Sequence, residues 1–146
     1  HEAGDQTLKE IAGRMLACVR EMDTVARLGG DEFTIILTDI QHAGDAATVA
    51  RKIQHAISRP IELQGKQFEL GCSIGISLYP KDGEDVDTLL KKADTTMYRA
   101  KESGSNDICF YTQSIGEEAI RQLDMERDLR RALRKDEFEL HYQLII

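Results

Sequence analysis

Two adjacent acidic residues, Asp31 and Glu32, follow a pair of glycines and lie between short apolar segments at residues 25–28 and 33–37. Two such segments joined by a Gly-Gly centre predict a β-hairpin. Glycines at its tip allow positive φ angles and bring bare N–H groups close to a ligand. The carboxylates supply oxygen ligands or a base, as a site for Mg²⁺ and a polyphosphate needs. The alternative is a solvated acidic turn, because Gly-Gly-Asp is common turn chemistry.

The composition allows one ordinary hydrophobic core and restricts the ligands. The 146 residues are 41% hydrophobic, and 26 acids against 19 bases give a formal charge of −7, which argues against a sequence-independent nucleic-acid binder. A nucleotide site remains compatible with this charge. We find no signal peptide and no apolar run of roughly 18–20 residues, so we expect a cytoplasmic segment without membrane contact. Upstream segments can still anchor a parent protein.

The cysteines and histidines show no spacing typical of metal ligands. Cys18, Cys72 and Cys109 are odd in number, widely separated and without a CxxC pair. We therefore expect reduced, partly buried thiols.

Apolar periodicity indicates an alternation of helices and strands. Helices are predicted over about residues 6–20, 43–58, 86–103 and 115–134, with Asp5 as the N-cap of the first and Pro60 ending the second. Asp85 or Asp87 lies near the start of the third. Strands are predicted in a small hairpin at residues 61–63 and 67–70, at 72–78, where Gly75 allows close packing, and at 107–111.

The residues Gly-Gly-Asp-Glu-Phe at positions 29–33 resemble the signature of the GGDEF domains of diguanylate cyclases. In that family two GTP molecules, each held by one domain of an antiparallel homodimer, are condensed into cyclic di-GMP. Three further stretches resemble the family: His-x-x-Gly-Asp at residues 1–5, Ser-Ile-Gly at 73–75, and Ala-Asp followed by Tyr-x-Ala-Lys at 93–101.

This resemblance implies an α+β fold, a ferredoxin-like or nucleotidyl-cyclase-like βαββαβ sandwich that carries the GGDEF β-hairpin. In the family a first strand in the middle of the sheet, a metal-binding aspartate and a first helix precede the position of His1. We expect the first strand and helix to be absent from this chain. The sheet is then incomplete, or a swapped or neighbouring element completes it; an exposed central edge favours aggregation.

The resemblance also implies roles for the residues of the hairpin. Asp31 binds Mg²⁺ or Mn²⁺ together with the upstream aspartate, and the metal bridges the β- and γ-phosphates. Glu32 orients or deprotonates the attacking ribose 3′-hydroxyl. Gly29 and Gly30 let the nucleotide approach the backbone closely.

Two more residues are implied to contact GTP. Asp5 is half of the guanine reader, whose other half is an upstream asparagine, and Lys101 reaches the triphosphate. The alternative for Lys101 is a purely structural role, because a solvated lysine near a helix C-terminus is favoured by the helix dipole. The family usually continues Gly-Arg-Asn, whereas this chain has Ser105 in place of the arginine; losing a charge-assisted phosphate contact costs about 1.5–3 kcal/mol.

Arg20 and Asp23 allow two interpretations. They can form a helix C-terminus and a turn. In the family, however, an Arg-x-x-Asp pair five residues before the first glycine is the product-inhibition site, which binds an intercalated cyclic di-GMP dimer. There the arginine pairs with phosphate or a guanine face and the aspartate with a guanine edge. We favour the binding site.

The character of the chain changes after residue 112. We divide it into a GGDEF portion at 1–112, a linker helix at 113–134 and the start of an EAL domain at 135–146. Residues 137–143, Glu-Phe-Glu-Leu-His-Tyr-Gln, resemble the opening of that cyclic di-GMP phosphodiesterase domain, but the Glu-Ala-Leu motif is absent. The linker's apolar residues need a packing partner: Ile120, Leu123, Leu129 and Leu133.

Two main functions follow. The intact Asp31-Glu32 pair favours a diguanylate cyclase, and Ser105 favours a non-catalytic GTP- or cyclic di-GMP-binding module that controls an attached EAL phosphodiesterase. A purely structural spacer is the third possibility. We expect no cyclase activity from these 146 residues alone, because half of the metal site and half of the guanine reader precede them.

Overall fold

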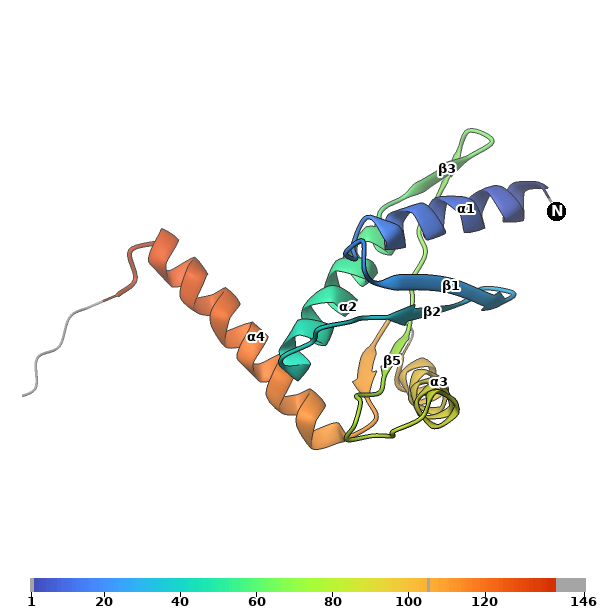
Figure 1. Ribbon diagram of the computed structural model, residues 1–146. Coiled ribbons are helices and arrows are strands. Elements are labelled where there is room, and N and C mark those ends of the chain that lie inside the picture. The colour runs from blue at the N-terminus through green and yellow to red at the C-terminus, as the bar shows by residue number, and fades with distance from the viewer. Residues whose placement is uncertain (1, 105, 139–146) are drawn as a thin grey trace, which may run out of the picture.

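Four helices and six strands follow one another in the computed structural model, which describes residues 2–104 and 106–138 (Figure 1). In chain order they are α1 (Glu2–Leu16), β1 (Thr24–Gly29), β2 (Glu32–Ile36), α2 (Ala43–Ser58), β3 (Ile61–Leu63), β4 (Lys66–Phe68), β5 (Ile74–Ile76), α3 (Val86–Ser103), β6 (Ile108–Phe110) and α4 (Gln113–Arg134). The fold is α+β, as the sequence predicts. No described helix is both long and apolar enough to cross a lipid bilayer.

The strands pair two by two. β1 and β2 form an antiparallel hairpin, β3 and β4 form another, and β5 pairs in parallel with β6. Within the described residues, β2 makes no ladder with β5, so the three pairs do not join into one sheet. Completion of the sheet by a swapped or neighbouring element, the other alternative, stays a prediction.

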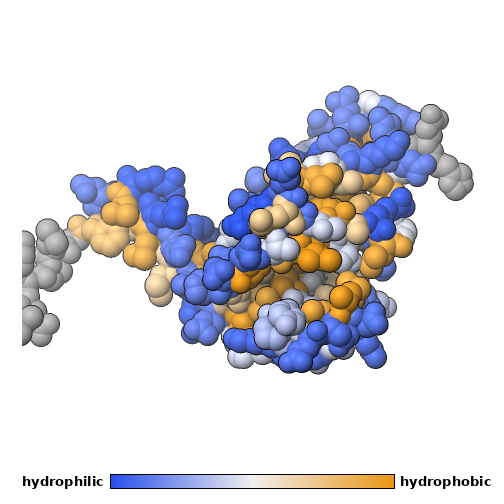
Figure 2. Space-filling model, viewed as in Figure 1, coloured by the Kyte–Doolittle hydropathy of each residue, from blue (hydrophilic) through white to orange (hydrophobic). Residues whose placement is uncertain are grey.

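Helix α2 lies at the centre of the packing. It contributes Ile53 and Ile57 to a core cluster with Met15 of α1, against which the hairpin packs. Its Ala46 and Ala47 belong to a second cluster with β6 and α4. Many of the buried positions are alanines, and apolar side chains remain accessible in a band between the hairpin and α3 (Figure 2). The apolar surface is therefore only partly covered, as expected beside unpaired strand edges.

Strand β5 separates α2 from α3. Ile74 and Ile76 pack toward the two core clusters, and successive side chains of a strand point to opposite faces, so Gly75 faces α3. A Cβ at Gly75 would lie 2.1 Å from the carbonyl oxygen of Ala93 and 2.3 Å from the backbone nitrogen of Met97. The predicted reason for this glycine, close packing, is confirmed.

The ends of α2 and α3 are capped by local chemistry. Asp45 Oδ2 accepts the backbone N–H of His42 at 3.0 Å, and Pro60 follows the last residues of α2. Asp85 is the N-cap of α3 and accepts the N–H of Thr88 at 2.8 Å. Because these signals are local, the bounds predicted for both helices match the observed ones.

One arginine joins α1 to α2. The side chain of Arg14, 11% exposed, donates to the carbonyl oxygens of Ala56 at 2.9 Å, Arg59 at 2.5 Å and Pro60 at 3.0 Å. These bonds lie at the C-terminus of α2, where carbonyls lack helical partners and a cation is favoured. Arg14 thus fixes the angle at which α1 crosses α2.

The predicted bounds of the first helix are wrong. α1 already includes Glu2 and ends at Leu16, so Asp5 lies inside the helix and is not its N-cap. Apolar spacing marks only the part of a helix that buries a face, and residues 4–6 are exposed. At the other end, residues 17–20 leave the helix because a turn closed by Asp23 competes with it.

Helix α4 packs along only half of its length (Figure 1). Its first half contacts α2 and β6: Leu123 packs on a core cluster, and Asp124 pairs with Arg51 at 3.0 Å. Leu129 and Leu133 are 46% and 68% exposed. A packing partner is therefore present for the first half of the helix, and the described residues supply none for Leu129 and Leu133.

Candidate functional site

The tip of the β1–β2 hairpin is a two-residue turn. Gly29 pairs with Glu32, which leaves Gly30 and Asp31 at the tip. Gly30 has φ of 52°, in the left-handed region that favours glycine. A Cβ at Gly29 or Gly30 would meet no atom within 4 Å, so the backbone here is open to close approach by a ligand.

Both tip carboxylates point into solvent. Phe33 and Ile35 pack on the α1–α2 core cluster, so strand alternation places Glu32 on the opposite face of the hairpin. Asp31 and Glu32 are exposed. Across residues 2–104 and 106–138, neither side chain forms an ion pair or hydrogen bond. The two acids are thus adjacent, accessible and not neutralised by a basic neighbour.

Sequence reasoning missed Arg27, whose guanidinium holds the tip. Its Nε and Nη2 donate to the carbonyl oxygen of Gly30 at 2.9 and 2.7 Å. An arginine three residues before a turn glycine is too common a pattern to predict this contact.

The carboxylate of Asp23 organises the chain around the predicted product site. Oδ2 accepts the backbone N–H of Arg20 at 2.8 Å, and Oδ1 accepts the N–H of Thr38 at 3.0 Å. Arg20 also accepts the N–H of Asp23 at 3.0 Å through its carbonyl. Asp23 therefore has the structural role that was the alternative interpretation, whereas the side chain of Arg20 is exposed and takes part in none of these bonds.

The bonds to Asp23 predict an acid-sensitive stability. The N–H groups of Thr38 and then Arg20 hold the pKa of the Asp23 carboxyl below its ordinary value. A depressed pKa in the folded state gives stability that is present above the unfolded pKa of about 3.9 and lost as the pH falls through the folded pKa.

We expect Asp23→Asn to be less stable than the wild type at pH 6 and to show a smaller further loss between pH 5 and 3. Urea unfolding followed by circular dichroism across this range measures the difference. Asp39→Asn is the control, because Asp39 is exposed and its side chain makes no hydrogen bond among the described residues. Parallel pH curves for wild type and Asp23→Asn would contradict the prediction.

The two residues implied to contact GTP lie on different helices. Asp5 is exposed near the start of α1, and α1 contacts β1 of the hairpin. Lys101 is exposed in the last turn of α3, and α3 packs on the face of β5 turned away from α2. Glu32 and α3 thus both lie on the side of the strands away from α2. Ser105 lies outside the described residues.

The donor set at the tip fits Mg²⁺ in part. Mg²⁺ is usually held by one or two carboxylates together with substrate phosphates and waters, and Asp31 with Glu32 supplies such carboxylates. No group of three or more histidine, cysteine or acidic side chains gathers in the part of the chain that the structure describes. The two carboxylates of the tip are therefore compatible with a magnesium ion that is also held by phosphate oxygens and waters.

The three cysteines are free and half-buried. Burial raises the pKa of the Cys72 thiol to about 11, and burial followed by the charge of Asp107 raises that of Cys109. Both thiols are therefore protonated at neutral pH and poorly nucleophilic.

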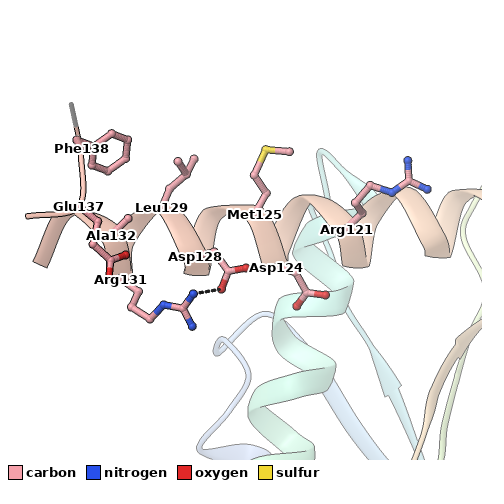
Figure 3. A pocket seen from close by; sticks show the side chains of 9 residues that line it. All are labelled: Arg121, Asp124, Met125, Asp128, Leu129, Arg131, Ala132, Glu137 and Phe138. Carbon is pink, nitrogen blue, oxygen red and sulfur yellow. Dashed lines mark ion pairs between the residues drawn. The ribbon is translucent and has the colours of Figure 1, made fainter. Parts of the chain in front are cut away.

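A shallow hollow lies along the exposed half of α4 (Figure 3). Met125, Leu129 and Phe138 point to one side of the helix, while Asp128 and Arg131, 3.7 Å apart, point to the other. Three carboxylates line the hollow, those of Asp124, Asp128 and Glu137, but they do not gather into a metal-binding group among the described residues. The hollow is a face of α4 that is separate from the hairpin.

The fold and the hairpin tip together define a GGDEF domain. The family model "Diguanylate cyclase, GGDEF domain" matches residues 1–107, which is most of the chain. The chain therefore belongs to the GGDEF family.

Relatives and solved structures agree with this assignment. The chain is 44% identical over 143 residues to the bifunctional diguanylate cyclase/cyclic di-GMP phosphodiesterase MucR of Pseudomonas aeruginosa, covering 98% of the chain and 21% of MucR. It is 38% identical over 146 residues to the cyclic di-GMP phosphodiesterase NbdA of the same organism, covering 100% of the chain and 18% of NbdA. The chain thus spans about a fifth of the length of these curated relatives.

Two solved structures show the same architecture. An EAL/GGDEF domain protein from M. capsulatus matches with a TM-score of 0.72 and 42% identity, over 77% of this chain and 72% of that one. The GGDEF domain of YfiN (TpbB) from Pseudomonas aeruginosa matches with a TM-score of 0.73 and 36% identity, over 80% and 69%.

Proposed function

We propose that this chain carries the catalytic hairpin of a diguanylate cyclase, which condenses two GTP molecules into cyclic di-GMP and pyrophosphate. One observation carries the proposal: Asp31 and Glu32 stand accessible and without basic partners at a glycine tip that is open to a nucleotide. The alternative, a solvated acidic turn, would not require the intact Gly-Gly-Asp-Glu-Phe signature at residues 29–33.

Each side chain has a task in this reaction. Glu32 accepts the proton of the ribose 3′-hydroxyl as its oxygen attacks the α-phosphorus of a GTP held by a facing domain. The bond from the α-phosphorus to the bridging oxygen breaks, and pyrophosphate leaves. Asp31 would hold Mg²⁺, which supplies charge neutralisation at the leaving phosphates. Asp5 reads the guanine and Lys101 contacts the triphosphate.

The geometry of the reaction requires two copies of the domain. Each hairpin holds one GTP. The 3′-hydroxyl of that GTP attacks the α-phosphate of a second GTP, which must be held by the hairpin of another domain. We therefore propose a homodimer, within a larger protein that also carries an EAL domain. Of residues 135–146, which we assign to the start of that domain, residues 139–146 lie outside the described residues.

The alternative is a regulatory module that binds GTP or cyclic di-GMP without turnover. It is favoured by Ser105, which replaces a phosphate-binding arginine, and by relatives named as phosphodiesterases. In this case GTP binding at the hairpin controls the EAL domain.

Incubating the full-length protein with radiolabelled GTP and Mg²⁺ separates the two. Cyclic di-GMP formation establishes the cyclase, and GTP binding by calorimetry without product establishes the module. Absence of both would overturn the two proposals together.

Substitution of Arg20 tests whether this turn binds cyclic di-GMP as a product-inhibition site. Because Arg20 holds its turn only through backbone atoms, Arg20→Ala should preserve the fold, whereas Asp23→Ala would also break the turn. Loss of charge-assisted bonds of about 1.5–3 kcal/mol should weaken cyclic di-GMP binding roughly 10- to 150-fold in calorimetry, with an unchanged melting temperature. Arg130→Ala on α4 is the control. Unchanged affinity in Arg20→Ala would assign this turn to structure alone.

A further inference from the structure

The hydrogen bonds of Arg27 concern the backbone of the tip. Two N–H groups of one guanidinium converge on the carbonyl oxygen of Gly30, at 2.9 and 2.7 Å. The bonds join residues 27 and 30, with Leu28 and Gly29 between them, at the exposed end of the hairpin. Because a guanidinium is planar and always charged, this contact persists at any physiological pH and fixes an orientation as well as a distance.

The contact lies across a β-bulge. Arg27 pairs with Phe33, but the next pair is Gly29 with Glu32, so Leu28 has no partner on β2. Leu28 is 65% exposed and therefore is not held by core packing. Bulges bend a strand and redirect the side chains that follow. The side chain of Arg27 thus spans the bulge and links the residue before it to the carbonyl of Gly30 after it.

Fixing the Gly30 carbonyl also fixes the next amide. In a trans peptide the C=O and the N–H point in opposite directions, so with the Gly30 carbonyl turned toward Arg27 the N–H of Asp31 points away from it. This N–H donates to no acceptor within the described residues. The tip therefore presents one free donor beside two carboxylates, in an orientation that Arg27 sets.

We propose that Arg27 is a positioning residue of the nucleotide site. By holding the Gly30 carbonyl it aims the Asp31 N–H at an oxygen of the bound polyphosphate and sets the direction of the Asp31 and Glu32 side chains. Arg27 itself need not touch the nucleotide. The inference rests on the proposed cyclase function for its kinetic consequence, but its structural consequence can be measured without turnover.

The kinetic test compares Arg27→Ala and Arg27→Lys with wild type in the full-length protein. A misplacement of about 1 Å costs on the order of 100-fold in rate, so Arg27→Ala should lower kcat by roughly that factor, with a smaller change in KM. Arg27→Lys keeps the charge but offers a single point donor, and should recover only part of the rate. Melting temperatures should stay near wild type, because Arg27 is exposed. Arg130→Ala is the matched control.

The structural test uses the 146-residue chain and NMR. In Arg27→Ala, the amide signals of Gly30 and Asp31 should shift without nucleotide. GTP with Mg²⁺ should perturb the Asp31 amide in wild type and should perturb it much less in Arg27→Ala. An Arg27→Ala variant with wild-type kcat, or with unchanged Gly30 and Asp31 signals, overturns the inference. If the wild type makes no product at all, the cyclase proposal fails on its own, and these amide signals still decide the role of Arg27.

Discussion

Replacing Glu32 by glutamine is expected to reduce cyclic di-GMP synthesis by about a thousandfold, in the middle of the range for loss of a general base. Glutamine keeps the size of the side chain but cannot accept the proton of the ribose 3′-hydroxyl. Glu32 is exposed and makes no ion pair among the described residues, so the change should leave folding intact. The measurement is product formed from radiolabelled GTP by the full-length protein, at saturating Mg²⁺.

The control for this variant is Glu62→Gln. Glu62 is also an exposed glutamate on a strand, β3, and it lies away from the hairpin tip in sequence and pairing. It should retain wild-type activity. Glu32→Gln with more than about a tenth of the wild-type rate would be incompatible with a general-base contribution of 10²–10⁴, and would favour the binding-module alternative if GTP still bound.

Replacing Gly75 by alanine is expected to destabilise the fold by at least about 3 kcal/mol, the upper part of the range for overpacking. The added methyl group would lie within 2.3 Å of backbone atoms of Ala93 and Met97, which belong to the regular part of α3 and cannot rotate away as a side chain can. Either α3 moves off β5 or the strand distorts. Urea unfolding followed by circular dichroism reports the loss.

Gly13→Ala is the matched control for this prediction. Gly13 lies in α1, where a Cβ would meet no atom within 4 Å. The same substitution there should stabilise the protein by roughly 0.5–1 kcal/mol, because alanine has the higher helix propensity. Similar stabilities of Gly75→Ala and wild type would show that α3 and β5 can separate without cost.

Several features of this protein could be predicted because their causes lie within a few residues. The bounds of α2 and α3 follow from apolar periodicity and from caps such as Asp85. The hairpin follows from its glycine centre, and the packing role of Gly75 from its place in an apolar strand. The family follows from short motifs, and the family model matches residues 1–107. The roles of the site residues in binding and turnover are predictions.

Other features were decided by contacts between segments far apart in the sequence. The bond of Thr38 to Asp23 spans 15 residues and gives that aspartate a structural role. Arg14 reaches carbonyl groups more than 40 residues away. The separation of the strand pairs and the exposed half of α4 likewise depend on which surfaces meet.

The physical reason for this division is the range of the interactions. Caps, turn conformations and side-chain periodicity are properties of neighbouring residues, so the sequence by itself determined where the chain bends and which face of each element is apolar. The hydrogen bonds that Arg14 donates to the end of α2, and the one that Asp23 accepts from Thr38, depend on how distant parts of the backbone are placed in three dimensions. Only the tertiary structure could decide which carbonyl or amide each of these charged groups would hold.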